Sequence, residues 1–498
     1  MSSPDFTATD REQLAVRGIS VEEAERQLEL LRHPPRKARL DRPCVVGDGV
    51  IVLSASEQDE ALGRGRTVVS AGRVTKFVPA SGAATRMFQG LIAVASGSAR
   101  PSSSDTGALF FSRLDAFPFS RELQELAGVS GAPASEADER ALLTTLLETM
   151  GYAEMPKGLI PFHRHTRPQT AFRDQLEEGA AYTRAASGDS RVHFTVAGDR
   201  RADFETLLEE VREEIEGTHD CSLQVSFSEQ QPSTDTIALD ASGQPFRLAS
   251  GELLFRPAGH GALIENLESL GGDVVVIKNI DNILPSGATS EVVRWKLVLI
   301  GVLANLETER DQLLAQSRAT SDASQLQDIV GRVAAVFGRS PDRPLSDVVA
   351  LQAFIASALD RPLRVCGVVR NEGEPGGAPF WVADGARSTR QIVESAQVDL
   401  TDPHQKRVFE SATHFNPVDI VCSLRDGSGT AYQLGRFVDP QAAFVARKTF
   451  DGRELTALER PGLWNGGMAH WNTINVEVPG STFAPVKTVF DLLRPQHQ

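Results

Sequence analysis

A short run of β-branched residues, Val274 to Ile277, constrains the fold of this chain more than any other feature of its sequence. A run that is apolar at every position is typical of a strand buried on both faces, as in sheets that carry helices on both sides. Segments with helical periodicity lie on either side of it, at 202–216 and 292–311. This alternation of helices and strands predicts an α/β fold with a mainly parallel sheet.

The segment before this domain has the pattern of a helical region. Ser20 and Glu23 form a capping box, and the apolar residues of 24–31 follow on one side of the expected helix. The prolines of 33–35 end that helix. We therefore expect a helical N-terminal region at 1–70, followed by the α/β domain.

Charge and cysteine content argue against several classes of protein. The formal net charge of −15 disfavours nucleic acid or an anionic membrane as the main partner. The four cysteines have no CxxC pair, so their spacing indicates neither a disulfide framework nor a zinc site. The polar segment 1–17 lacks a signal-peptide core, and no apolar run approaches the roughly 20 residues of a membrane span. We expect a cytoplasmic protein, and the sequence does not indicate its oligomeric state.

A loop of small residues follows the strand predicted at 76–79 and opens a helix. Its members are Ala80, Ser81, Gly82, Ala83 and Ala84. Small side chains let a backbone approach a triphosphate closely, and the start of the next helix favours negative charge. Arg86 would neutralise the phosphates. The loop is neither a P-loop nor a GxGxxG fingerprint, and a tight strand–helix turn explains it equally well.

Asp281 and Asn282 come directly after the strand at 274–277. Ligands of parallel α/β sheets gather at the carboxyl ends of strands. A carboxylate at this position suits Mg²⁺ that carries phosphate oxygens, so Asp281 is the candidate metal ligand. The plainer alternative is an Asn/Asp-rich turn.

Two lysines stand at proline-bounded corners. Lys157 lies between Pro156 and Gly158, and Lys487 follows Pro485. Taken singly, the first is typical of a solvated loop and the second of an ordinary strand-to-helix junction. His163 and His165 form a His-x-His pair, but no third metal ligand is visible, so we expect them to be loop or substrate-edge residues.

Two further segments suggest ligand recognition. His260 lies between Gly259 and Gly261, a pattern that lets a flat ligand such as a pyrimidine lie against the main chain, although a glycine-rich turn looks the same. Gln230 ends a strand and could read a base edge. The segments that hold Gly377, Glu394 and Asn416 could shape a sugar pocket, yet each alone is more often a structural turn.

In sequence order these segments resemble UDP-glucose and UDP-N-acetylhexosamine pyrophosphorylases, which are nucleotidyltransferases with a glycosyltransferase-A-like, Rossmann-like fold. The match spans about residues 74 to 495. At a finer level the chain resembles the DUF4301 domain family, a bacterial branch of that superfamily. The correspondences that carry the match are the small-residue loop with Thr85 and Arg86, then 156–160, 257–261, 279–282, and 485–488 with 491–493.

The resemblance implies a reaction in which a sugar 1-phosphate attacks the α-phosphorus of a nucleoside triphosphate, first of all UTP, giving a nucleotide sugar and pyrophosphate. It implies that Arg86 and Lys157 hold the triphosphate, that Asp281 holds Mg²⁺, and that Lys487 binds the reacting phosphoryl groups. The residues it places at the nucleotide are the small-residue loop, Gln230, Gly259, His260, Gly261 and Asn282. Those it places at the sugar are Gly377, Glu394 and Asn416.

The same resemblance implies a nucleotide-binding catalytic core at 71–360 and, at 361–498, a sugar-side subdomain that ends in the catalytic lysine segment. Three departures stand beside it. The loop has less glycine than the family usually has, Ala262 replaces a residue that is often acidic or polar, and the C-terminal β-helix of many relatives is not expected. A non-catalytic nucleotide or nucleotide-sugar binding protein, or a nucleotidyltransferase that uses CTP or a non-sugar phosphate, are the alternatives.

Overall fold

The computed structural model of the protein describes residues 6–35, 37–165, 167–373 and 376–498. The chain folds into two compact units. Unit 1 comprises Met1–Val68, Gln230–Val276 and Val298–Val478, and unit 2 comprises Val69–Glu229, Ile277–Leu297 and Pro479–Gln498. Each unit is thus assembled from three separate segments. The sequence predicted three consecutive domains. That division differs from the two compact units and stays a prediction.

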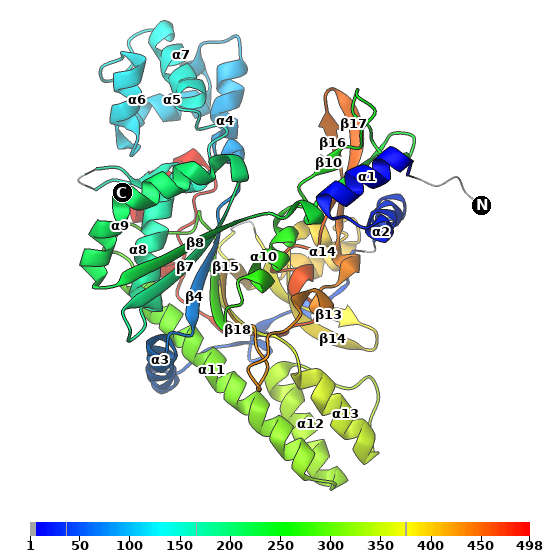
Figure 1. Cartoon of the computed structure of the whole chain (residues 1–498). Coiled ribbons are helices and arrows are strands. Elements are labelled where there is room, and N and C mark those ends of the chain that lie inside the picture. The colour runs from blue at the N-terminus through cyan, green and yellow to red at the C-terminus, as the bar shows by residue number, and fades with distance from the viewer. Residues whose placement is uncertain (1–5, 36, 166, 374–375) are drawn as a thin grey trace. The chain divides into compact units, whose positions relative to one another are not determined.

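Unit 2 contains a parallel sheet with the strand order β4-β7-β8. The strands are β4 (Val74–Pro79), β7 (Asp189–Val196) and β8 (Ser222–Glu229). Parallel neighbours need a crossover, and here α8 (Ala171–Thr183) packs on β4 and β7 while α9 (Arg201–His219) packs on α8 and β8. Figure 1 shows these helices beside the strands. The expected helix at 202–216 is confirmed within a few residues.

An aromatic core fills the helical part of unit 2. Its helices are α4 (Thr85–Ser96), α5 (Asp105–Ser112), α6 (Ser120–Ala127) and α7 (Glu136–Thr144). Phe110 and Phe119 both contact Phe117, and Phe88 and Phe119 both contact Tyr152. All five rings are buried, so this cluster fixes the helix that begins after the small-residue loop.

Unit 1 contains the strand order β2-β3-β18-β12-β15-β11. These strands are β2 (Val45–Val46), β3 (Gly49–Ile51), β18 (Asn472–Glu477), β12 (Leu363–Arg370), β15 (His414–Ser423) and β11 (Val274–Lys278). The pairs β2–β3, β3–β18 and β18–β12 are parallel, whereas β12–β15 is antiparallel. Every residue of β11 is buried, as its β-branched run predicts, and its last two residues belong to unit 2.

Two smaller sheets complete unit 1. One has the order β10-β9-β17-β16, formed by Phe255–Arg256, Thr236–Asp240, Arg453–Glu459 and Phe444–Phe450. The helices α1 (Ala8–Arg17) and α2 (Val21–Arg32) pack their leucines on it, and Ser20 caps α2 through the Glu23 amide at 3.1 Å. The other sheet joins β1 (Leu40–Pro43), β13 (Ala378–Asp384) and β14 (Arg387–Val393), with α14 (Pro403–Glu410) against β1. The expected helical region 1–70 thus also contains short strands.

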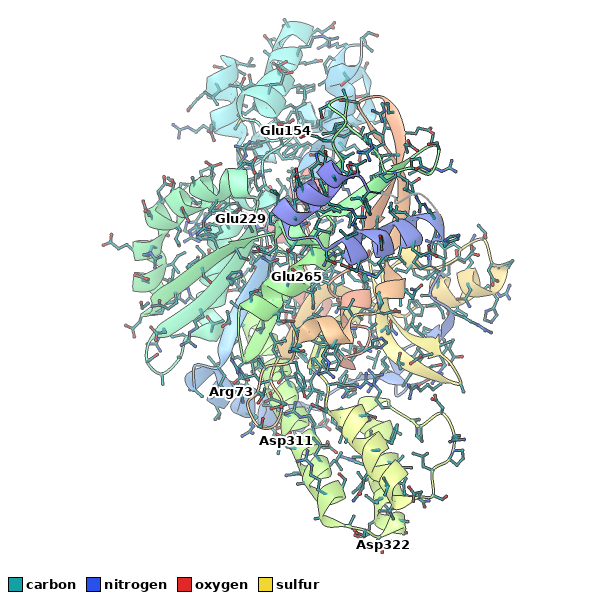
Figure 2. All side chains as sticks on the ribbon, turned by 45° about the vertical axis from the view of Figure 1, so that its right-hand side comes forward. Arg73, Glu154, Glu229, Glu265, Asp311 and Asp322 are labelled. Atoms are coloured by element: carbon teal, nitrogen blue, oxygen red, sulfur yellow. The ribbon has the colours of Figure 1, made fainter. Side chains whose placement is uncertain are left out.

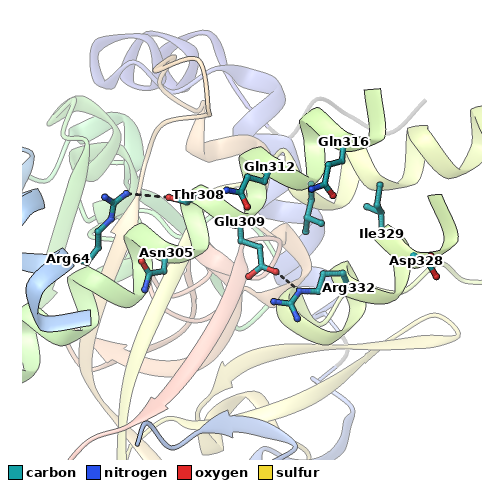
Figure 3. A pocket seen from close by; sticks show the side chains of 10 residues that line it. Arg64, Asn305, Thr308, Glu309, Gln312, Gln316, Asp328, Ile329 and Arg332 are labelled. Carbon is teal, nitrogen blue, oxygen red and sulfur yellow. Dashed lines mark hydrogen bonds and ion pairs between the residues drawn. The ribbon is translucent and has the colours of Figure 1, made fainter. Parts of the chain in front are cut away.

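The remaining helices are α3 (Ala55–Ser70), α10 (Leu263–Ser269), α11 (Ser290–Ala319), α12 (Ala323–Phe337) and α13 (Val348–Leu359), and β5 (Pro161–His163) pairs with β6 (Gln169–Thr170). In unit 1, residues of α3, α11 and α12 line a pocket of about 720 Å³ (Figure 3). Its cations have partners, because Arg332 is ion-paired with Glu309 and Arg64 donates to Thr308. Among the described helices none is long and apolar enough to span a bilayer.

Candidate functional site

The small-residue loop and the Lys157 segment lie side by side in unit 2. The amide of Ala84 donates to the Met155 carbonyl at 2.9 Å, and the amide of Lys157 donates to the Gly82 carbonyl at 3.2 Å. Ala80 and Ala84 are buried, whereas Ser81, Gly82 and Ala83 are exposed. The middle of the loop therefore presents small residues to solvent beside Lys157.

Asp281 lies between two lysines. Its Oδ2 atom is 2.8 Å from Nζ of Lys157 and 3.4 Å from Nζ of Lys487, and its Oδ1 atom is 3.5 Å from Nζ of Lys487. Burial alone would raise the pKa of Asp281, but the charges of Lys487 and Lys157 together hold that pKa below its ordinary value. The carboxylate is therefore ionised at neutral pH, and three segments that are distant in sequence meet at one acidic group.

The backbone of the Lys487 segment is fixed on both sides of that lysine. The amide of Val486 donates to the Asp281 carbonyl at 2.8 Å, and the amide of Ala484 donates to Oδ1 of Asn282 at 3.0 Å. The carboxylate of Asp491 accepts the amide of Lys487 at 2.8 Å. Asn282 is 2% exposed, so its side chain supports the lysine segment, and its predicted contact with nucleotide stays a prediction.

The three predicted cations of unit 2 differ in their exposure and in their partners. The side chain of Lys157 is 13% exposed and also donates to the Val486 carbonyl at 3.0 Å, whereas that of Lys487 is 47% exposed. Arg86 lies in the first turn of α4, is exposed, and makes no hydrogen bond or ion pair with the described residues. Lys487 and Arg86 are thus the cations that a ligand can reach most easily.

A second polar cluster lies in unit 1 around His260. The imidazole stacks on Trp464 with 4.1 Å between ring centroids, and its Nδ1 accepts the Leu463 amide at 3.1 Å. Because Nδ1 is an acceptor, the proton of the neutral ring is on Nε2. Burial lowers the pKa of His260, which keeps the ring neutral. Trp464 donates through Nε1 to Glu394 at 3.2 Å, so one indole joins two predicted site residues.

Several other predicted site residues of unit 1 make packing and hydrogen-bond contacts within the protein itself. The amide of Asn416 donates to the Gly377 carbonyl at 2.8 Å, and its side chain bonds Gly367 and Val418. A Cβ atom at Gly261 would lie 2.3 Å from the Pro461 carbonyl, so close packing requires that glycine. Gly259 has φ = 75°, a conformation that favours glycine. These contacts account for the residues without a ligand, and their predicted roles stay predictions.

Sequence reasoning missed the segment around Trp464 and Asn465. Asn465 is 1% exposed, donates through Nδ2 to the Ile392 carbonyl at 3.0 Å, and has no described partner for its Oδ1. A Cβ atom on Gly462 would lie 2.7 Å from that oxygen and 2.8 Å from Nε2 of His260. A donor and an acceptor therefore face the same small space. The signal was a tryptophan and an asparagine within a glycine-rich segment, 462–467.

The family model described as "Domain of unknown function (DUF4301)" matches residues 7–498. The chain belongs to the DUF4301 family. No curated protein matches its sequence.

The solved structures include similar folds. Uridine diphosphate N-acetylglucosamine pyrophosphorylase from Trypanosoma brucei, in complex with an inhibitor, has a TM-score of 0.51 and 14% identity, with 98% of this chain and 79% of that chain covered. A mutant of UDP-glucose pyrophosphorylase from Leishmania major, in complex with UDP-glucose, has a TM-score of 0.46 and 13% identity, with 99% and 78% covered. The first similarity confirms the expected mixed, mainly parallel α/β fold of the pyrophosphorylases.

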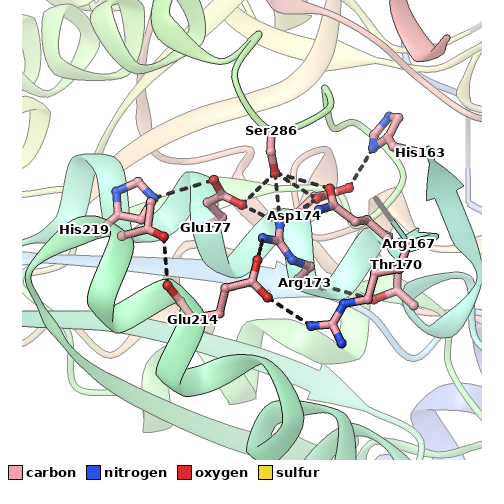
Figure 4. A network of polar contacts seen from close by, with 11 residues as sticks. His163, Arg167, Thr170, Arg173, Asp174, Glu177, Glu214, His219 and Ser286 are labelled. Carbon is pink, nitrogen blue, oxygen red and sulfur yellow. Dashed lines mark hydrogen bonds and ion pairs between the residues drawn. The ribbon is translucent and has the colours of Figure 1, made fainter. Parts of the chain in front are cut away.

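The expectation for His163 was wrong in the DUF4301 chain. His163 ends β5, is fully buried, and shares its two ring nitrogens between Asp174 at 2.6 Å and His497 at 2.9 Å. It belongs to a network around α8 in which Ser286 and Arg173 also bond one another at 2.9 Å (Figure 4). The network joins Ser286 and, through His163, His497 to α8. His165 is exposed.

A buried charge cluster of the DUF4301 chain was also not predicted. Glu178 of α8 accepts hydrogen bonds from Lys76 of β4 at 3.1 Å and from Lys278 of β11 at 2.5 Å, and all three side chains are buried. Burial lowers the pKa of Lys76 to about 7. Burial opposes ionisation of Glu178, but the charges of Lys278, Lys76 and Lys296 lower its pKa to about 2. The only signal was a lysine within an apolar strand. The described residues contain no group of three or more metal-binding side chains.

Proposed function

We propose that this DUF4301 protein is a nucleotidyltransferase that forms a nucleotide sugar and pyrophosphate from a nucleoside triphosphate and a sugar 1-phosphate. UTP is the first candidate nucleotide. The observation that carries the proposal is the meeting of Lys157 and Lys487 on Asp281, at the end of β11, in the unit that also holds the exposed small-residue loop. The pyrophosphorylase fold supports it.

In this reaction an oxygen of the sugar 1-phosphate attacks the α-phosphorus, a new P–O bond forms, and the bond to the β-phosphate oxygen breaks with release of pyrophosphate. The protein has little covalent chemistry to perform, because alignment and neutralisation of charge lower the barrier. The half-exposed Lys487 would bind the attacking phosphate and the α-phosphoryl oxygens. Arg86 and Lys157 would hold the triphosphate beside the loop that contains Gly82.

The residues also fit Mg²⁺ that arrives with the triphosphate. Such a metal needs only one or two protein carboxylates, because phosphates and waters complete its shell. Asp281 is one ionised carboxylate of this kind, and in the protein alone both of its oxygens face lysines. When bound, Mg²⁺ would neutralise phosphate charge. We propose that the lysines turn from Asp281 to the phosphate oxygens as the substrate enters.

We propose that the cluster of unit 1 recognises the nucleoside and the sugar. His260 and Trp464 offer an aromatic surface, and Glu394 offers a carboxylate, a combination common in pockets for small polar ligands. Gln230, Gly259 and the other predicted residues of unit 1 would complete that surface. Both substrates are phosphorylated metabolites, and we place the reaction in the cytoplasm.

A non-catalytic nucleotide or nucleotide-sugar binding protein is the second candidate. The ion pairs of Asp281 with two lysines favour it, because these lysines compensate the charge of the carboxylate without a metal. A nucleotidyltransferase that uses CTP or a non-sugar phosphate would share the residues of unit 2.

One experiment separates these candidates. The protein is incubated with Mg²⁺, each common nucleoside triphosphate and a panel of sugar 1-phosphates, and pyrophosphate release is followed. We expect release with one pair, at least 100-fold above that of Lys487→Ala, while Lys406→Ala, a change at an exposed lysine, behaves as wild type. Triphosphate binding without release for any pair would refute the enzyme and favour the binding protein.

A further inference from the structure

Four arginines line one pocket of unit 1. The pocket has a volume of about 930 Å³, and its lining includes Arg339, Arg361, Arg387, Arg436 and His470. These arginines come from four places: just after α12, just after α13, the start of β14, and the short helix Leu434–Phe437. Residues distant in sequence thus bring positive charge to one cavity.

The gathering is notable in a chain with a net charge of −15. Acidic residues are spread over many elements, as Glu154, Asp311 and Asp322 illustrate (Figure 2). A local concentration of arginine against such a background needs a cause, because like charges repel one another and oppose folding.

The two more buried arginines have only neutral hydrogen-bond partners among the described residues. Arg339 donates to Oδ1 of Asn472 at 3.0 Å and to the Trp471 carbonyl at 2.6 Å. Arg361 donates to the carbonyls of Ser357 at 2.8 Å and His470 at 2.9 Å. Burial and then the charges of Arg361 and Arg387 lower the pKa of Arg339 to about 9. Neither arginine forms an ion pair with a described carboxylate, although the negative charge of Asp384 favours the protonated form of both.

The other two arginines differ in their partners. Nε of Arg387 has no hydrogen-bond partner in the described part of the chain, but it is ion-paired with Asp342 at 3.5 Å and with Asp384 at 3.6 Å. Arg436 is exposed and has no ion pair with a described residue.

The three acidic residues of the lining all have partners. Asp426 accepts the amides of Ser428 at 2.8 Å and Thr430 at 2.9 Å, and so closes its own turn. Asp360 is hydrogen-bonded with Tyr432. The third acidic residue, Asp384, is ion-paired with Arg387, so the lining has four arginines and three carboxylates.

We propose that this pocket binds a small molecule with a phosphate group, separately from the substrates of the proposed reaction. Guanidinium groups match the geometry and charge of phosphate oxygens, and four of them suit a dianion. All the residues belong to unit 1, whereas Lys157, Asp281 and Lys487 belong to unit 2. The pocket of Figure 3 has a similar size, but its Arg332 is paired with Glu309, so it provides a matched control.

The test measures binding of inorganic phosphate, pyrophosphate and glucose 1-phosphate by calorimetry, without metal or turnover. All titrations use the Lys487→Ala background, which weakens anion binding in unit 2. We expect Arg436→Gln and Arg361→Gln each to weaken binding at least tenfold, and Arg332→Gln to leave it unchanged. Arg436 is exposed, so its substitution keeps the test valid even if Arg361→Gln unfolds the protein.

The probe that binds most tightly identifies the source of the phosphate group, which is either a free anion or a sugar ester. Binding of all probes that is unaffected by Arg436→Gln and Arg361→Gln, or no binding of any probe, would overturn the proposal. The proposed reaction is judged by pyrophosphate release in the protein with its native Lys487. Failure of that reaction and failure of this pocket are therefore separate results.

Discussion

Replacing Asp281 with asparagine keeps the shape of the side chain and removes the charge that two lysines share. In the wild-type protein Oδ2 of Asp281 lies 2.8 Å from Lys157 and 3.4 Å from Lys487. The variant leaves two ammonium groups beside a neutral amide and frees both for phosphate oxygens. We therefore expect a nucleoside triphosphate without metal to bind more tightly, and Mg²⁺-dependent pyrophosphate release to fall at least 100-fold.

The same change should lower stability by an amount that follows from burial. Loss of one partner of a fully buried ion pair costs about 3–5 kcal/mol, and loss of an exposed pair costs less than about 1 kcal/mol. Lys157 is 13% exposed but keeps its bond to the Val486 carbonyl, and Lys487 is 47% exposed. We expect the free energy of unfolding to fall by about 2 kcal/mol, between these limits.

The stabilisation by the Asp281 carboxylate should decrease as the pH falls. The pKa of Asp281 is lowered in the folded state, so its contribution is present above the unfolded pKa of about 3.9 and is lost as pH falls through the folded value. Urea unfolding at several pH values and calorimetry with triphosphate in EDTA test both effects, with exposed Asp328→Asn as the control. Wild-type stability at neutral pH, or weaker binding of metal-free triphosphate, would refute the shared-charge explanation.

Three other substitutions test separate contacts. Lys487→Ala should lower the urea midpoint only slightly, since the side chain is half exposed, while pyrophosphate release falls at least 100-fold. Near-normal turnover would remove Lys487 from the mechanism. Lys76→Met should flatten the pH dependence of stability between about 7 and 10, measured by urea unfolding. Burial lowers the pKa of Lys76 to about 7, so the unfolded state binds more protons than the folded state in that pH range. The free energy of unfolding of the wild type therefore rises with pH. An equal rise in the variant would contradict this explanation. His497→Ala should lower the free energy of unfolding by about 1–3 kcal/mol, because buried His163 loses its partner; an unchanged urea midpoint would show that the contact contributes nothing.

The sequence predicted those parts of the site that depend on local pattern. A buried strand followed by an acidic turn can be recognised over a few residues, so the position of Asp281 at the end of β11 followed from Val274 to Ile277. The corner that holds Lys487 was recognisable from Pro485 and the apolar residues beside it. The rule that parallel strand ends meet at one edge does not place Lys157 or Lys487, because both lie at or beside short 3-10 helices.

What the sequence could not give is the identity of long-range partners. His163 pairs with His497, 334 residues away, and nothing local distinguishes that histidine from an exposed one. Glu178 and Lys76 form an ion pair whose burial depends on how α8 packs on β4, and a helical pattern alone does not reveal it. From the sequence, Asn282 was predicted to bind the nucleotide. That its side chain accepts the Ala484 amide is visible only in the folded structure.

The tautomer of His260 restricts the chemistry of any group that meets this ring. Since the Leu463 amide occupies Nδ1, the imidazole can only donate through Nε2. A base placed there must supply an acceptor, as the carbonyl O4 of uracil does, whereas the exocyclic amino group of cytosine would place donor against donor. One backbone amide, contributed by a glycine-rich turn, would thus be enough to make this position discriminate between the two pyrimidines.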